Sequence, residues 1–90
     1  MNVEWDDEKD ERTLTERGFS FADVLPAFSD SNRMVEVDDR YEYGEVRFRL
    51  FGRVAGRLFV VFTKRADTIR IISARRANAR ERKRYGESPT

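Results

Sequence analysis

The spacing of apolar residues changes near residue 34 from a helical period to a period of two. Residues 19–28 carry apolar side chains at helical intervals, with Ser20 and Asp23 placed as in a capping box. Residues 45–51 alternate apolar and charged side chains, which is typical of a strand with one buried face. Residues 57–63 are apolar on both faces and predict the central strand of a sheet. The two patterns together predict an α+β fold in which helices cover one face of a sheet.

The remaining elements follow from caps, turns and shorter apolar runs. The expected elements are a short strand at 3–5, helices at about 7–17 and 19–28, strands at 34–37, 45–51, 57–63 and 69–74, and a basic helix at about 77–85. Pro26 should shorten or kink the second helix, and residues 52–56 are expected to turn. The sequence therefore predicts a short N-terminal strand and two helices packed on a four-stranded antiparallel sheet, followed by a C-terminal basic helix. We expect one domain over residues 1–90, with a loose tail at about 86–90.

The composition excludes several classes of protein. The chain of 90 residues has no Cys and no His, which excludes serine–histidine and cysteine–histidine hydrolases, disulfide scaffolds and cysteine zinc sites. Its longest apolar run, Leu58 to Phe62, is too short for a transmembrane helix. We therefore expect a cytoplasmic protein without a membrane partner.

The formal net charge of +1 conceals a strong asymmetry along the chain. Residues 1–45 contain 14 Asp and Glu against five Lys and Arg, whereas residues 46–90 contain three against 13. Such an asymmetry predicts a basic surface that binds a polyanion, with the acidic half elsewhere on the molecule. A solvated basic surface that only keeps the protein soluble is the alternative interpretation.

Basic residues gather at the expected ends of two strands. Lys64 and Arg65 end the central strand, and Arg75 and Arg76 end the next one. One guanidinium group can donate two parallel hydrogen bonds to two phosphate oxygens, so this set of residues favours a phosphodiester ligand. Because antiparallel pairing joins the two strands, we expect Arg65 and Arg75 to converge on one phosphate. Three tyrosines are candidates for stacking on bases: Tyr41, Tyr43 and Tyr85.

Several segments together resemble the BrnT toxin family of bacterial type II toxin–antitoxin systems. The matching residues are Trp5-Asp6, Lys9, Leu14, Gly18, Phe21, Gly44-Glu45, Arg47, Gly56-Arg57, Thr63, Arg65, residues 70–77, Glu81 and Tyr85. The stretch 70–77 is the most specific, and the resemblance covers nearly the whole chain. It implies a compact relative of the RelE fold and a ribosome-independent endoribonuclease whose cleavage of RNA inhibits translation and growth.

The resemblance also implies partners. A small BrnA-like antitoxin with a ribbon-helix-helix domain neutralises such a toxin in a heterotetramer, and the complex contacts operator DNA only through the antitoxin. No metal or organic cofactor is implied. We expect the antitoxin to cover the basic face between the sheet and the last helix, because blocking RNA access is the simplest route to neutralisation.

The chain departs from the family pattern at three positions. Relatives often have an Asn and a His near the end of the first helix, where this chain has Thr13 and Arg17, and a Glu where it has Lys64. A His-dependent mechanism cannot operate here. We therefore expect orientation and charge to drive the attack of a 2′-hydroxyl on the adjacent phosphate.

The resemblance and the chemistry of the side chains together give a candidate site. The candidate catalytic residues are Glu45 as general base, Lys64 as proton donor, and Arg65, Arg75 and Arg76 as cations that stabilise the developing negative charge. The candidate RNA-binding residues are Lys9, Arg47, Arg70, Arg80 and Tyr85. No metal ligands are expected.

Two other classes of function remain open. The first is a module that holds RNA or DNA without cutting it, which the missing His makes plausible. The second is a protein-interacting subunit whose basic face engages an acidic antitoxin. Incubation with a defined RNA separates cutting from holding, and a neighbouring reading frame for a ribbon-helix-helix protein supports a toxin pair.

Overall fold

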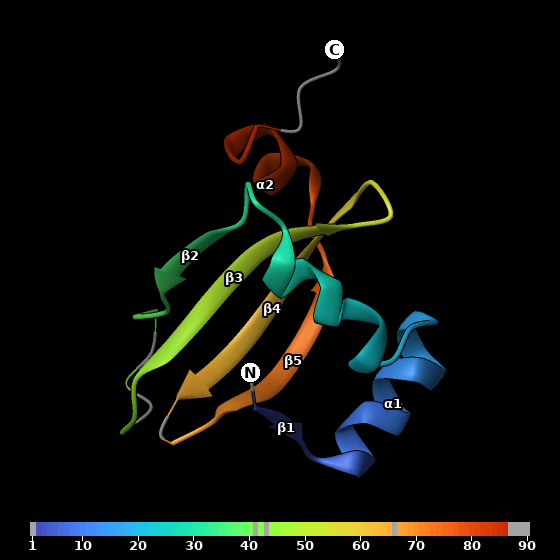
Figure 1. Cartoon of the computed structure of the whole chain (residues 1–90), viewed down its shortest axis with the longest axis vertical. Coiled ribbons are helices and arrows are strands. Elements are labelled where there is room, and N and C mark those ends of the chain that lie inside the picture. The colour runs from blue at the N-terminus through green and yellow to red at the C-terminus, as the bar shows by residue number, and fades with distance from the viewer. Residues whose placement is uncertain (1, 41, 43, 66, 87–90) are drawn as a thin grey trace.

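The computed structural model describes residues 2–40, 42, 44–65 and 67–86. In chain order the elements are β1 (Val3–Trp5), α1 (Asp7–Arg17), the 3-10 helix η1 (Ala22–Ser29), β2 (Met34–Val37), β3 (Arg47–Val54), β4 (Arg57–Arg65), β5 (Ile69–Arg76) and α2 (Ala79–Arg84). Figure 1 shows a single twisted sheet with η1 across one face, α1 beside β5, and α2 at the far end. The expected α+β class is confirmed.

The sheet has five strands in the order β1-β5-β4-β3-β2 and is mixed rather than wholly antiparallel. Strands β2 to β5 pair antiparallel with their chain neighbours. The expected four-stranded antiparallel sheet is therefore incomplete, because β1 adds a parallel strand to the free edge of β5, with Val3 opposite Ile69 and Trp5 opposite Ile71. This pairing supplies partners for backbone groups of β5 that would otherwise lie at an edge.

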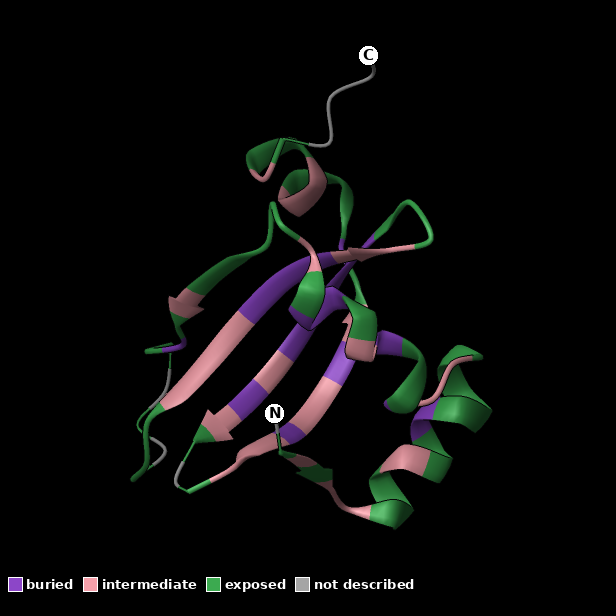
Figure 2. Cartoon of the chain, in the orientation of Figure 1, coloured by how far each residue is buried: buried purple, intermediate pink, exposed green. Residues whose placement is uncertain are grey.

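The first helix begins and ends where its caps predict. The Asp6 side chain accepts from the backbone N–H groups of Glu8 and Lys9, and Gly18 ends the helix at a φ of 81°. Thr13 is the buried residue of α1. The helix therefore lies at the edge of the molecule with most of its charged side chains in solvent (Figure 2).

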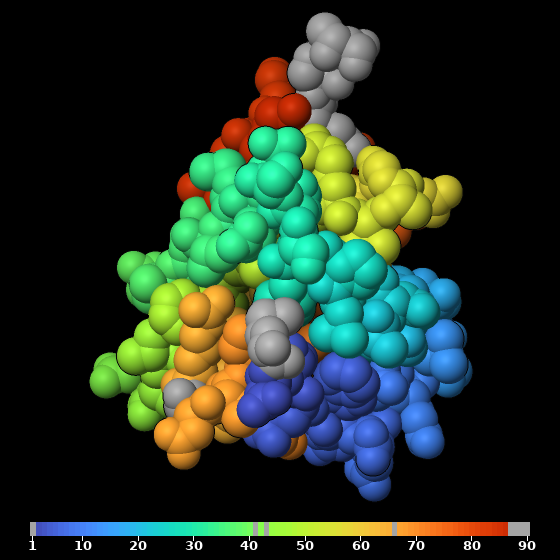
Figure 3. Space-filling model, viewed as in Figure 1, coloured from blue at the N-terminus to red at the C-terminus, as the bar shows by residue number. Residues whose placement is uncertain are grey.

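The second helix is a 3-10 helix that contains Pro26. Its buried side chains are Val24, Ala27 and Phe28, and Figure 3 shows its residues covering the middle of one face of the molecule. The backbone of β3 passes directly beneath it, since a Cβ on Gly52 would lie 2.5 Å from the carbonyl oxygen of Ala27. The expected turn over 52–56 is for this reason shorter: Gly52 stays in the strand, and only Ala55 and Gly56, both at positive φ, make the hairpin turn.

Apolar side chains pack on both faces of the sheet. The larger cluster lies under η1 and contains Phe21, Val24, Ala27, Phe28, Leu50, Phe59, Val61, Ile71 and Ala74. The smaller cluster lies on the other face and contains Phe51, Leu58, Val60 and Ala77, with Phe62 and Tyr85 packed against it. The second cluster holds the C-terminal segment of the chain against the sheet, which leaves the rest of that face uncovered.

The C-terminal helix is shorter than expected because Asn78 caps it. The Asn78 side chain accepts from Glu81 N–H while Glu81 accepts from Asn78 N–H, so the helix begins at Ala79. Within the described residues, no helix is both long and apolar enough to span a membrane.

A β-bulge interrupts the pairing of β4 with β5. Phe62 lies opposite Ser73 and Thr63 lies opposite Ile71, which leaves Ile72 without a cross-strand partner. Ile72 and Ser73 consequently both line the same surface hollows beside β5. The bulge therefore shapes the surface described next.

Candidate nucleic-acid interface

Three basic side chains form a row across the face of the sheet that η1 does not cover. Arg70 of β5 lies opposite Lys64 of β4, and Lys64 lies opposite Arg47 of β3. In the next row on the same face, Ser73 and Arg49 flank Phe62. Three of the predicted site residues are thus brought side by side by the register of the sheet.

A hollow of about 330 Å³ opens on this face, and we call it the sheet hollow. Its walls come from α1, the segment after β2, and strands β3 to β5. The lining residues are Arg17, Asp38, Arg40, Arg47, Phe62, Ile72, Ser73 and Arg75. Four of these eight residues are arginines, so the hollow is rich in guanidinium groups.

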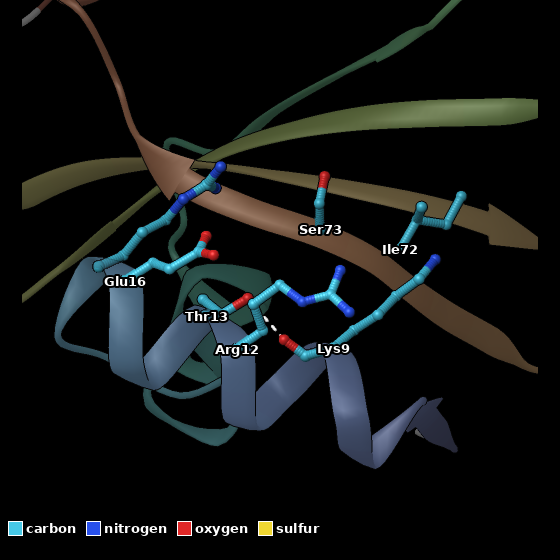
Figure 4. A pocket seen from close by; sticks show the side chains of 7 residues that line it. Lys9, Arg12, Thr13, Glu16, Ile72 and Ser73 are labelled. Carbon is cyan, nitrogen blue, oxygen red and sulfur yellow. Dashed lines mark hydrogen bonds between the residues drawn. The ribbon is translucent and has the colours of Figure 1, made fainter.

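A second hollow lies between α1 and β5, and we call it the helix hollow (Figure 4). It is lined by Lys9, Arg12, Thr13, Glu16, Arg17, Ile72 and Ser73. The helical residues are three or four positions apart, which places them on one face of α1. Because the two hollows share Arg17, Ile72 and Ser73, they form one groove along β5.

Carboxylates from the edge strands β1 and β2, from the segment before β3 and from α2 pair with arginines of the sheet. The shortest distances are 3.3 Å for Arg70–Glu4, 2.7 Å for Arg49–Glu36, 3.0 Å for Arg47–Glu45 and 2.6 Å for Arg75–Glu81. The expectation that the acidic half lies elsewhere on the molecule is wrong. The reason is topological, since β1 and β2, from the acidic half, flank β5 and β3, from the basic half.

The cations of α1 differ from those of the sheet. Lys9, Arg12 and Arg17 make no ion pair in the part of the chain that the structure describes. Arg17 donates a hydrogen bond to the carbonyl oxygen of Ala74, which holds its guanidinium at the edge of β5. The helix hollow thus holds three cations against one carboxylate, Glu16, and has an excess of positive charge.

Glu45 and Lys64, predicted as general base and proton donor, lie together. The Glu45 carboxylate is 3.0 Å from Arg47 Nε and 3.6 Å from Lys64 Nζ. The hydrogen bond from Arg47 and the nearby Lys64 charge keep the pKa of Glu45 below its usual value. Glu45 is therefore ionised at neutral pH and is a weak base.

Arg75 is held in a bidentate ion pair. Its two terminal nitrogens donate to the Glu81 carboxylate at 2.6 and 2.9 Å, and these hydrogen bonds are the main reason that the pKa of Glu81 is lowered. The Arg75 guanidinium carbon lies 5.5 Å from the centre of the Phe62 ring. Arg75 thus has a fixed position in the sheet hollow and a compensated charge.

The expected convergence of Arg65 and Arg75 is wrong. Arg65 lies opposite Ile69 and Arg75 lies opposite Val60, so the two arginines are at opposite ends of the β4–β5 pairing. In an antiparallel pair the end of one strand lies beside the start of the next. The alternation of side chains also puts Arg65 on the opposite face, where its guanidinium carbon is 4.8 Å from the Phe48 ring centre.

Of the predicted residues that the structure describes, only Lys9, Arg47 and Arg75 line the two hollows. Arg76 is exposed at the end of β5, opposite Phe59, and Arg80 is exposed on α2. Tyr85 stacks on Phe51 at a centroid distance of 3.9 Å and donates a 2.7 Å hydrogen bond to Glu36. Burial and this hydrogen bond raise the pKa of Tyr85 to about 12. Tyr41 and Tyr43 fall outside the described residues.

Several lining residues were missed by the sequence analysis, among them Arg12, Arg40, Phe62 and Ser73, and Arg17 was noted only as a departure from the family pattern. The spacing of Lys9, Arg12 and Thr13 on one helical face could have indicated Arg12. No sequence signal marks the bulge that turns Ser73 to this surface. Within the described residues, no three acidic side chains gather as metal ligands, and the groove offers cations, hydroxyls and carboxylates for its chemistry.

Comparison with known proteins supports a family assignment. No curated protein matches the chain. The model of a family described as ribonuclease toxin, BrnT, of type II toxin–antitoxin systems matches residues 5–81, a span that includes α1, the sheet strands β2 to β5 and both hollows. The chain therefore belongs to the BrnT family of ribonuclease toxins.

Proposed function

We propose that this chain is a metal-independent endoribonuclease that cuts RNA in the groove along β5 without the ribosome, and so arrests translation and growth in the cytoplasm. The observation that carries the proposal is the helix hollow, where three cations without ion pairs in the described part of the chain lie beside Ile72 and Ser73 of β5. Such cations attract the RNA backbone and release its counterions. A fold related to RelE is part of the same proposal.

The chemistry rests on the Glu45, Lys64 and Arg47 cluster, which adjoins the groove at Arg47. In the proposed step the 2′-hydroxyl attacks the adjacent phosphorus, Glu45 takes the hydroxyl proton, and the bond to the 5′ oxygen breaks as Lys64 donates a proton to it. Arg47, fixed by its 3.0 Å ion pair with Glu45, stabilises the charge that develops on the phosphate. Because the lowered pKa of Glu45 makes it a weak base, most of the rate comes from charge and orientation.

The proposal includes a partner. A BrnA-like antitoxin with a ribbon-helix-helix domain covers the groove, bridges two toxins in a heterotetramer and contacts operator DNA itself. Membership of a type II toxin–antitoxin family supports a protein antitoxin. A single surface that holds RNA and is blocked by the antitoxin accounts for both toxicity and neutralisation.

The test is cleavage of a defined RNA by purified protein in the presence of a metal chelator. We expect wild-type protein to cut the RNA, and Lys64→Gln or Arg47→Gln to slow cleavage by roughly 100-fold. Arg57→Gln removes an exposed charge at the start of β4, away from the groove lining, and is the matched control. Full cleavage by both Lys64→Gln and Arg47→Gln contradicts the assignment, and binding without cleavage by wild type favours a module that only holds RNA.

A further inference from the structure

We propose that Phe62 and the two guanidiniums over its ring, those of Arg40 and Arg75, form a nucleobase subsite, so that the groove takes single-stranded RNA with one base stacked against these flat groups. The inference rests on the proposed function in taking RNA as the ligand. It adds a contact to the base, whereas the cations discussed so far contact the backbone.

Phe62 occupies an unusual position for a phenylalanine in a sheet. Its cross-strand neighbours are Arg49 and Ser73, both polar, whereas Val61, beside it in the chain, is fully buried. One side of the half-buried ring packs against the cluster that contains Leu58 and Val60, and the ring lines the sheet hollow. The ring therefore gives the hollow an apolar, aromatic wall among charged groups.

Two guanidinium groups lie over this ring. The guanidinium carbons of Arg40 and Arg75 are 5.3 and 5.5 Å from the ring centre. Each is fixed by a bidentate carboxylate: Arg40 donates to Asp38 at 2.7 and 3.0 Å, and Arg75 donates to Glu81. The Asp38 side chain is only 2% exposed, so the Arg40 guanidinium is anchored to the protein interior.

These guanidiniums are better suited to a base than to a phosphate. Each already gives two nitrogen donors to one carboxylate, which leaves fewer donors for a phosphate. Their planes and the Phe62 ring are flat surfaces of the kind on which unpaired RNA bases stack. The sheet hollow is thus a stacking site, while the cations on the helix side of the groove suit the backbone.

The junction of the hollows fits this division. Arg17, Ile72 and Ser73 line both of them, so a strand held at α1 reaches Phe62 along the floor of β5. Bases in a duplex are stacked and paired within the helix and are not free to turn onto a protein ring. The groove should accordingly prefer single strands.

Binding to a non-cleavable RNA tests the subsite without requiring catalysis. The probes are a 2′-O-methyl single strand, the same strand without bases, and the same strand annealed to its complement. We expect Phe62→Leu to weaken binding of the base-containing strand by roughly 10-fold and to leave binding of the abasic strand unchanged. Phe62→Trp should bind like wild type, and its fluorescence should change with the base-containing strand only.

Phe48→Leu is the matched control. Phe48 is also half-buried with an arginine over its ring, but it lies on the opposite face of the sheet. We expect both affinities of this variant to match wild type. The subsite is overturned if Phe62→Leu loses affinity equally for the abasic and the base-containing strand. It is also overturned if the variant keeps its affinity for both strands. If Phe62→Leu does not fold, an indole fluorescence of Phe62→Trp that the base-containing strand leaves unchanged overturns it.

The outcomes also separate this inference from the proposed function. Wild-type protein that cuts RNA while Phe62→Leu keeps wild-type affinity refutes the subsite alone. Protein that shows base-dependent binding through Phe62 but cuts no RNA refutes the cleavage proposal alone.

Discussion

Replacing Arg12 by Gln should reduce the salt dependence of RNA binding by about one phosphate contact. Three cations line the helix hollow without an ion pair in the described part of the chain: Lys9, Arg12 and Arg17. The logarithm of the binding constant falls by about 0.7 per log unit of salt for each single-strand phosphate contacted. Three contacts therefore predict a slope of about −2 for wild type, and Arg12→Gln should change the slope to about −1.4. Between about 0.05 and 0.2 M salt, affinity should fall about 20-fold for wild type and about 7-fold for the variant.

The assay is titration of a labelled 2′-O-methyl single strand at several salt concentrations, with Arg57→Gln as the control for a lost exposed charge. Arg57 lies at the start of β4, outside the groove lining, so its variant should keep the wild-type slope. A flat salt response in wild type would remove the electrostatic argument. Equal slopes for Arg12→Gln and Arg57→Gln would show that overall charge, and not the helix hollow, attracts the RNA.

Three further predictions concern the fold. Phe21→Ala should destabilise the protein by about 3 to 5 kcal/mol, because Phe21 is fully buried; an unchanged urea midpoint contradicts this packing. Gly52→Ala should lower the free energy of unfolding by about 1 to 3 kcal/mol, since its Cβ would lie 2.8 Å from the Ala27 Cβ. Thermal unfolding measures this loss, and a stabilised variant would show that η1 lies farther from β3 than in this structure. The pKa of Tyr85 is raised from 10.0 to about 12, so stability that is present below pH 10 should be lost as pH rises through this interval. In Tyr85→Phe the urea midpoint should fall less between about pH 10 and 12 than it does in wild type. If the two proteins show the same dependence of the midpoint on pH, the hydrogen bond from Tyr85 to Glu36 is not the source of the alkaline loss of stability.

The strands were predictable because their side-chain period is short and local. Leu50 is buried under η1, as the alternation in its strand indicates, and Val61 is buried, as the apolar run at 57–63 predicts. Asp6 and Gly18 set the bounds of α1 through contacts within a few residues. Features that depend on distant parts of the chain were not predictable: Gly52 has the composition of a turn but stays in a strand because Ala27 packs over it.

The candidate site was predicted less well than the fold for the same reason. Register alone brings Lys64 beside Arg47, and this proximity could be anticipated once the hairpin was assigned. The pairing of Glu4 with Arg70 depends on β1 joining the sheet in parallel, which no local pattern indicates. Counting charges along the chain consequently overstated the free positive charge of the sheet.

The parallel pairing of β1 with β5 also governs when the protein can fold during synthesis. Val3 is synthesised well before Ile69, with which it pairs, and the core under η1 needs Leu50, Val61 and Ala74 from later strands. Contacts between such distant segments form only after the intervening chain is available. The floor of the groove, at Ile72 and Ser73, is synthesised well after α1. A nascent chain therefore carries the cations of α1 without a cleft beside them, and the groove is assembled only after β5 has been made.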